Sequence, residues 1–171
     1  MTAVERRTLA KERGGRPPGS VGPLGQSATT VFGTTGIALT NATFVLVPNL
    51  TQTFTVPAGG ASVYVSTDGG AFCNTAATNG FSIVDVAFSI DNGDPVRSAQ
   101  NGGFRRLFAM NNVNVTSVIE NWSFEETLVL TPGTHSVRVL ARLAGGNTAA
   151  VSSGNTDSVL QGQLTVMILK N

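Results

Sequence analysis

The chain of 171 residues contains a single cysteine and a single histidine. Because a disulfide needs two cysteines, Cys73 excludes a disulfide framework within the chain. One histidine, His135, excludes a zinc site built from several histidines of one chain. No base or cation lies near Cys73 in the sequence to activate its thiol. The small residues around it, GGAFCNTAATNG, therefore predict an inert cysteine in a loop.

Charge is also scarce. Charged residues make up 12% of the chain, against roughly 25% in ordinary soluble domains. The polar character comes from Thr, Ser, Asn and Gln, beside 20 glycines, and the formal net charge is +1. This composition is typical of short strands joined by tight turns under a neutral surface. Such a small net charge gives no basis for attracting nucleic acid, so we expect no nucleic-acid partner.

Long apolar runs are missing as well. No stretch approaches the 18 or more apolar residues of a membrane-spanning helix. No apolar segment of about 7–15 residues follows the basic N-terminus, as it would in a signal peptide. The sequence predicts a protein made in the cytoplasm without a signal peptide and not inserted into a membrane.

Catalytic patterns are absent too. There is no G-x-S-x-G nucleophile motif, no phosphate-binding loop and no G-x-G-x-x-G before a helix. Glu125 and Glu126 are adjacent on an expected strand and point to opposite faces, so they cannot form a glycosidase pair with each other. A pair from different strands, such as Asp85 with Glu126, has little support because nothing else in the sequence indicates an acid/base site. We expect no enzyme and no cofactor. Whether Asp91 and Asp94, in IDNGDP, hold a cation stays open.

His135 follows the turn residues Thr131-Pro132-Gly133-Thr134. It is in phase with Val137 and Val139 at the start of a strand. A catalytic histidine would need a nucleophile and an orienting carboxylate, and no motif supplies them. The position predicts a hairpin-end residue that packs or forms hydrogen bonds locally.

The first 16 residues carry five basic and two acidic side chains. Thr2 and Glu5 match a capping box and Gly14 with Gly15 would end a short helix, but its apolar stripe is too thin to fold alone. A Pro/Gly-rich linker, residues 16–27, follows. We therefore expect residues 1–28 to form an arm that docks on a particle or shell protein. The residues expected to anchor it are Arg6, Arg7, Leu9, Lys11 and Arg13.

From residue 29 onward the hydrophobic period is two. In LTQTFTV the apolar Leu50, Phe54 and Val56 alternate with threonines, and FSIVDVAFSID alternates in the same way. Turn signals separate about eight to ten such runs. The pattern predicts an all-β fold for residues 29–171, an antiparallel β-sandwich of jelly-roll type.

The final run, QLTVMILK, is apolar on both faces. Leu164, Val166 and Ile168 are expected to face the core of the domain. The other face, Thr165, Met167 and Leu169, is expected to contact a second copy, because exposed apolar patches usually mark interfaces. The alternative is that the N-terminal arm covers this face.

Aromatic residues are few: nine Phe, one Trp and one Tyr. Phe104 and Phe108 beside Arg105 and Arg106 are interpreted as core phenylalanines with two strand arginines, not as an RNA-stacking platform. The segment 122–126 and the loops within 91–106 are expected to contact a receptor or neighbour. For a sugar site, the aromatics considered are Trp122 and Tyr64.

The C-terminal half resembles a known family. The residues that carry the resemblance are Trp122-Ser123, the segment LVLTPGTHSVRV over 128–139 and the segment LTVMIL over 164–169. Over residues 44–170 they resemble the small trimeric jelly-roll heads of bacteriophage and phage-like particles, such as capsid decoration proteins and tail-fibre tips. More distantly, they are similar to the complement/tumour-necrosis-factor jelly roll. The resemblance implies a homotrimer that binds partners, and it supplies no catalytic residue.

Fibre tips usually follow a long shaft, whereas a short arm precedes this domain, which favours a decoration or adaptor protein. We expect a non-enzymatic structural or binding protein of a virion or other extracellular particle. A cell-surface glycan or receptor is a possible partner, and the alternative function is a carbohydrate-binding, lectin-like module.

Overall fold

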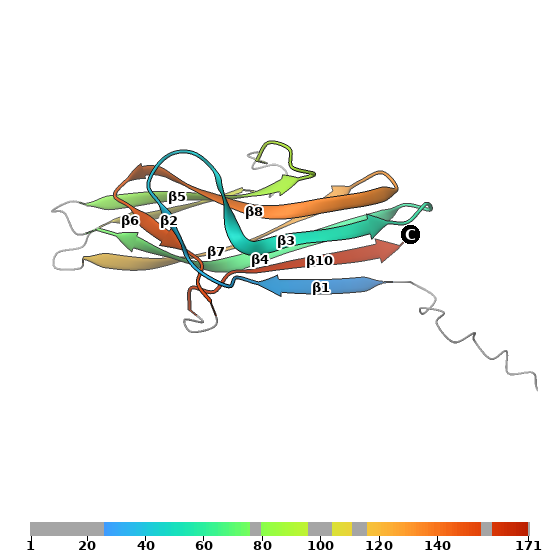
Figure 1. Ribbon diagram of the computed structural model, residues 1–171, viewed down its shortest axis with the longest axis horizontal. Helices are drawn as coiled ribbons and strands as arrows, with labels where there is room; N and C mark the ends of the chain where they lie inside the picture. The colour runs from blue at the N-terminus through green and yellow to red at the C-terminus, as the bar shows by residue number, and fades with distance from the viewer. Residues whose placement is uncertain (1–25, 76–79, 96–103, 111–115, 155–158, 171) are drawn as a thin grey trace, which may run out of the picture.

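The computed structural model describes residues 26–75, 80–95, 104–110, 116–154 and 159–170. Within them the chain forms two sheets that pack as an antiparallel β-sandwich (Figure 1). The strands are β1 (Ser27–Phe32), β2 (Ile37–Leu39), β3 (Val45–Val56), β4 (Ala61–Asn74), β5 (Phe81–Ile90), β6 (Phe104–Met110), β7 (Ser117–Val129), β8 (Gly133–Gly146), β9 (Ala149–Val151) and β10 (Gln163–Lys170). The predicted all-β sandwich is confirmed. The predicted N-terminal helix lies outside the described residues.

The strand pairs are nested in the sequence. β5 pairs with β6, β4 with β7, β3 with β8 and β1 with β10, all antiparallel. Successive pairs belong to alternate sheets. Sheet B has the order β3-β8-β5-β6, and sheet A has the order β1-β10-β4-β9-β2 with β7 on the other side of β4. β10 therefore lies between β1 and β4, as Figure 1 shows.

The period-two pattern places the core as expected. In β3, Leu50, Phe54 and Val56 are buried while the alternating Thr51, Thr53 and Thr55 are exposed. In β5, Val84, Val86 and Phe88 are fully buried between the sheets. Each buried apolar side chain of this size contributes roughly 1.5–3 kcal/mol relative to an exposed one.

Cys73 lies inside β4 and not in a loop, so that prediction was wrong. The small residues before it indicated a turn, but Gly69 and Gly70 are part of the strand. A Cβ atom added at Gly69 would lie 2.4 Å from Cζ2 of Trp122. Gly69 is needed because the indole of Trp122 packs directly on the backbone of the neighbouring strand. A Cβ atom at Gly70 would instead lie 2.8 Å from the carbonyl oxygen of Val159 and 2.9 Å from Cδ2 of Leu160.

Trp122 is 2% exposed, and its Nε1 donates a hydrogen bond of 3.2 Å to Oγ1 of Thr67. The expectation that Trp122 contacts a receptor or a sugar was therefore wrong. Its position on β7 is in phase with the buried Phe124 and Leu128, so the indole belongs to the core.

The core assignment of Phe104 and Phe108 also failed. On β6 it is Leu107 and Ala109 that face the core, whereas Phe108 is 53% exposed on the outer side of sheet B. Its ring stacks on Phe81 with the centroids 5.9 Å apart. Alternation along a strand shows which residues share a face, but not which face points inward.

β1 begins at Ser27, so Ser27 and Ala28, placed by the sequence at the end of the arm, pair with Ile168 and Met167. The expected turn at Asp91-Asn92-Gly93 forms, with the amide of Gly93 donating to the carbonyl of Ile90 over 2.8 Å. The next described strand, however, starts at Phe104. Within the described ranges, no helix is long and apolar enough to cross a membrane.

Candidate interaction face and adjoining pocket

The predicted contact residues lie together on the outer side of β10. Thr165, Met167 and Leu169 are half-buried there, while Leu164, Val166 and Ile168 fill the core on the other side. The two apolar faces predicted for this strand are therefore present, one in the core and one on the outer side of the sheet. The half-burial of the outer residues arises within one subunit, because β10 has a neighbouring strand on each side.

We call the outer side of β1, β10, β4 and β7 the interaction face. Around Met167 the face carries no charged side chain on β1, β10 and β4: Ala28 and Thr30 stand on β1, and Ser62, Tyr64 and Ser66 on β4. On β7, Glu125 is paired with Ser66 and accepts a hydrogen bond from the hydroxyl of Tyr64. The hydroxyl groups of Thr30 and Thr165 form a hydrogen bond of 2.8 Å across the two strands. This part of the face is neutral, hydroxyl-rich and interspersed with apolar side chains.

Large apolar side chains lie exposed at the borders of the interaction face. Val129, at the end of β7, is 92% exposed, and Phe32, at the end of β1, is 50% exposed. Phe72 and Ile119 are directly paired farther along β4 and β7, and both are exposed. Apolar surface of this extent is what a protein contact would bury.

The two sheets carry opposite charge. The strands of sheet A hold four carboxylates and one lysine, whereas those of sheet B hold four arginines and one aspartate. The charged residues of sheet A are Asp68, Glu120, Glu125, Glu126 and Lys170; those of sheet B are Asp85, Arg105, Arg106, Arg138 and Arg142. Three of the four carboxylates of sheet A stand on β7, so the charge of the interaction face lies at its β7 side and not on β1 or β10 around Met167.

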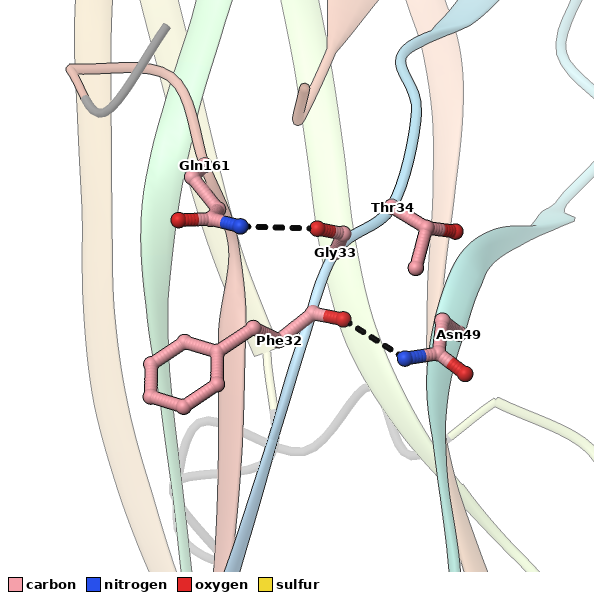
Figure 2. Close-up of a pocket in the computed structure, with 5 residues that line it drawn as sticks. All are labelled: Phe32, Gly33, Thr34, Asn49 and Gln161. Atoms are coloured by element: carbon pink, nitrogen blue, oxygen red, sulfur yellow. Dashed lines mark hydrogen bonds between the residues drawn. The ribbon is translucent and has the colours of Figure 1, made fainter. Parts of the chain in front are cut away.

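A pocket of about 400 Å³ adjoins the interaction face where β1 ends. Phe32, Gly33, Thr34, Asn49 and Gln161 line it. Figure 2 shows the Phe32 ring and Gln161 on one side of the chain segment that carries Gly33, and Thr34 and Asn49 on the other. Sequence analysis missed this pocket, because its residues meet only through the pairing of β1 with β10 and an irregularity in β3.

Two amide side chains hold the segment in place. Nδ2 of Asn49 donates to the carbonyl of Phe32 over 2.7 Å, and Nε2 of Gln161 donates to the carbonyl of Gly33 over 2.9 Å (Figure 2). Asn49 itself has a φ of 65°, at the register shift between β3 and β8. This left-handed conformation is one that asparagine tolerates better than most residues.

His135 forms the local hydrogen bonds expected of a hairpin-end residue. Its Nδ1 lies 2.7 Å from Oδ2 of Asp91, and its Nε2 lies 2.8 Å from the carbonyl of Thr131. The hydrogen bond to Asp91, with that to Thr131, raises the pKa of His135 above its ordinary value. The same contact, with the amide of Ser136, lowers the pKa of Asp91. The turn prediction for His135 is confirmed.

Asp85 and Glu126 do not form a carboxylate pair. They lie on different sheets, and Asp85 is fully buried beneath two arginines on the outer side of sheet B. Nε of Arg106 lies 2.7 Å from Oδ1, and Nε of Arg142 lies 2.9 Å from Oδ2. The sequence carries a signal for this cluster, because Asp85 lies within an otherwise largely apolar strand. A carboxylate that is buried in such a strand requires a cationic partner.

Burial, with the nearby charge of Glu120, raises the pKa of the Cys73 thiol to about 11, consistent with an inert cysteine. In the part of the chain that the structure describes, no group of three or more His, Cys, Asp or Glu side chains is placed to hold a metal ion. One carboxylate of the suggested cation turn, Asp91, is engaged by His135 and Ser136. The anchoring residues Arg6, Arg7, Leu9, Lys11 and Arg13 lie outside the described residues.

No protein-family model matches the chain, and no curated protein matches it. Among solved structures, a chain of the infectious bursal disease virus T13 particle matches 85% of this chain, with 11% identity and a TM-score of 0.37. The capsid asymmetric unit of cyanophage Pam1 matches 98%, with 16% identity and a TM-score of 0.35. The globular domain of zebrafish complement 1qA matches 82%, with 13% identity and a TM-score of 0.34.

The fraction of each matched protein that this chain covers differs among the three. The chain spans about a third of the bursal disease virus chain, whose covered fraction is 35%. It covers 100% of the cyanophage chain and 94% of the complement domain.

Proposed function

We propose that this chain is a non-enzymatic structural protein of a phage or phage-like particle, which assembles as a homotrimer through the interaction face. The observation that carries the proposal is the neutral, partly apolar outer row of β10 around Met167, bordered by the exposed Phe32 and Val129. The nested strand pairing supports a jelly roll, since paired strands in alternate sheets are the arrangement of that fold. The assignment to a particle rests on the resemblance of the segments 128–139 and 164–169 to phage heads.

The non-enzymatic part of the proposal is supported by how the titratable groups are used. Both ring nitrogens of His135 already have acceptors, the Asp91 carboxylate and the Thr131 carbonyl. Asp85 is enclosed by Arg106 and Arg142. These groups stabilise turns and strands and do not face a common substrate space.

Replacing Met167 with glutamate is expected to convert a trimer into monomers. The charged side chain would lose its hydration on contact without gaining a cationic partner, since its neighbours on β1 and β4 are uncharged and Glu125, bonded to Tyr64, is itself acidic. The measurement is the solution mass of the intact chain and of the variant by light scattering. Met110→Glu is the matched control, because Met110 is 60% exposed on the opposite sheet, and this variant should remain a trimer.

A trimeric Met167→Glu variant with an unchanged circular dichroism spectrum would contradict the assignment of the contact to this face. A monomeric wild-type chain would overturn the trimer and would favour coverage of the face by the N-terminal arm.

We further propose that the arm, residues 1–28, anchors the domain through Arg6, Arg7, Leu9, Lys11 and Arg13. Because Ser27 and Ala28 pair with β10, the deletion that tests this should remove residues 1–25 only. The shortened chain is expected to keep its fold and to lose co-sedimentation with its particle. Substituting glutamine for Arg6, Arg7, Lys11 and Arg13 in the full chain tests the contribution of charge alone. Undiminished co-sedimentation of the shortened chain would show that the domain itself makes the attachment.

Carbohydrate binding is the second candidate function. The burial of Trp122 removes one of the aromatics considered for it, and the hydroxyl of Tyr64 is engaged by Glu125. The pocket beside Phe32 favours this candidate, because it combines an exposed ring with uncharged polar side chains.

A further inference from the structure

We propose that the outer side of sheet B is a second docking surface, which binds a protein segment that carries large apolar side chains beside a carboxylate. We call this surface the sheet B patch. Its members are Phe81, Ile83, Phe108 and Met110 in two apolar rows, and Arg106 and Arg142 in an adjoining arginine row. Because the core lies between the two sheets, the patch faces away from the interaction face. The inference therefore goes beyond the homotrimer and does not depend on it.

The sheet B patch leaves a contiguous apolar area uncovered. Phe81, Phe108 and Met110 are 38%, 53% and 60% exposed. Met110 is paired with Phe81 across β6 and β5, and the ring of Phe81 stacks on that of Phe108. Ile83 is paired with Phe108 on one side and with Gly145, which has no side chain to cover it, on the other. Contiguous exposed apolar surface of this kind usually marks a contact with another protein.

The adjoining row is cationic. Arg106 and Arg142 flank Asp85 on the neighbouring strands, so two arginines share one carboxylate and the row has a net charge of +1. Arg106 contacts Asp85 through Nε and Nη2, and among the described residues no hydrogen bond engages its Nη1. Its side chain is 52% exposed. A carboxylate of a partner would meet a guanidinium there whose orientation is already fixed.

The residue types of the patch fit a protein better than a nucleic acid. Phe, Met and Arg are enriched at protein interfaces, whereas Lys, Ser and Ala are depleted. A net charge of +1 neutralises too few phosphates for appreciable release of counterions. The aliphatic side chains of Ile83 and Met110 offer no ring on which a base can stack. The patch therefore fits an acidic and apolar protein segment.

The spacing of the rows specifies the pattern of that segment. Outer positions of one strand are two residues apart, so Phe81, Ile83 and Asp85 follow one another at intervals of about 7 Å. An extended segment of a partner has the same period. Its side chains i and i+2 would lie on the apolar rows, and its side chain i+4 would reach the arginines. The N-terminal arm of the chain is a poor occupant, because its first 16 residues carry five basic and two acidic side chains.

The test adds short synthetic peptides to the nitrogen-15-labelled full chain and follows the NMR signals of its N–H groups. The first peptide, acetyl-Ser-Leu-Ser-Leu-Ser-Asp-Ser-amide, has the expected pattern, and in the second a lysine replaces the aspartate. The acidic peptide is expected to shift the signals of β5 and β6 and of the Nε–H groups of Arg106 and Arg142. It should bind about tenfold more tightly than the lysine peptide, as expected for one hydrogen bond to a charged group.

Met110→Glu should weaken binding of the acidic peptide about tenfold, because it removes an apolar contact and adds a carboxylate of the same sign. Met167→Glu is the matched control, since it is the same substitution on the opposite sheet and should leave peptide binding unchanged. The two variants also separate this proposal from the homotrimer. Met110→Glu should remain a trimer and lose the peptide, whereas Met167→Glu should lose the trimer and keep the peptide.

Three results would overturn the proposal: no shifts with the acidic peptide at millimolar concentration, equal binding of the lysine peptide, or undiminished binding by Met110→Glu. Tighter binding of a single-stranded oligothymidylate than of the acidic peptide would overturn it in favour of nucleic acid. Light scattering provides the last check. Association beyond a trimer that Met110→Glu abolishes would overturn the proposal in favour of a second copy of the chain as the occupant.

Discussion

Replacing Trp122 with alanine is expected to lower the free energy of unfolding by about 4 kcal/mol, within the range for removal of a large aromatic side chain from a core. The indole is 2% exposed and lies against the backbone of Gly69, so its loss leaves a cavity in the core over that part of β4. It also leaves the hydroxyl of Thr67 without its indole donor. Urea unfolding followed by circular dichroism, at one fixed protein concentration, gives the difference.

Gly69→Ala tests the same contact from the other side. Its new Cβ would overlap the Trp122 ring and would lie 2.7 Å from Cα of Gly162, and we expect a loss of about 3 kcal/mol from this overpacking. Gly59→Ala is the control, because a Cβ added at Gly59 meets nothing within 4 Å. A loss below about 1 kcal/mol for Trp122→Ala would place the indole at the surface and would restore its expected role in receptor contact.

Asp85→Asn is expected to cost about 3 kcal/mol, at the lower end of the range for breaking a buried ion pair, because Arg106 is half exposed. The substitution keeps the shape of the side chain but removes the charge that neutralises Arg106 and Arg142. Glu125→Gln is the control for an exposed carboxylate on the other sheet and should change stability by less than about 1 kcal/mol. Equal effects of the two substitutions would mean that Asp85 is hydrated.

The pH dependence of the Asp85→Asn difference follows from the same contacts. Burial alone would raise the pKa of Asp85, but the hydrogen bonds and charges of Arg106 and Arg142 outweigh it and hold the pKa below its ordinary value. The stabilisation by Asp85 is therefore fully present above the pKa of an unfolded aspartate, about 3.9, and is lost as the pH falls through the lower folded value. The wild type and Asp85→Asn should differ at pH 7 and converge in acid, as measured by thermal unfolding across this range.

The sheets of the sandwich could be predicted from sequence because period-two alternation is a local property. The segment LTQTFTV identifies its own buried face, and β10 identifies two apolar faces. The errors arose where the deciding partner is distant in sequence. Gly69 and Gly70 look like a turn unless one knows that Trp122, more than 50 positions from Gly69, packs on Gly69 and that Leu160 packs on Gly70. Phe108 looks like a core residue because its own strand does not show which side is covered.

The candidate site, too, could be predicted only in part from the sequence. Thr165, Met167 and Leu169 were found together because they occupy one face of one strand. The pocket joins Phe32, Asn49 and Gln161 from three separate segments, and no spacing rule connects them. The left-handed backbone of Asn49, within VPNLT, is a local clue, since asparagine after proline often interrupts a strand.

The position of β10 between β1 and β4 has a consequence for synthesis of the chain. Ribosomes release β1 before β10, yet among the described strands the neighbour of β1 in its sheet is β10 alone. While β10 is being made, the facing edges of β1 and β4 have unpaired N–H and C=O groups, which other growing chains can pair with. Native pairing of β1 must wait for translation of residues 163–170. An inserted stop codon before residue 163 should therefore yield aggregated chains instead of a shorter soluble sandwich.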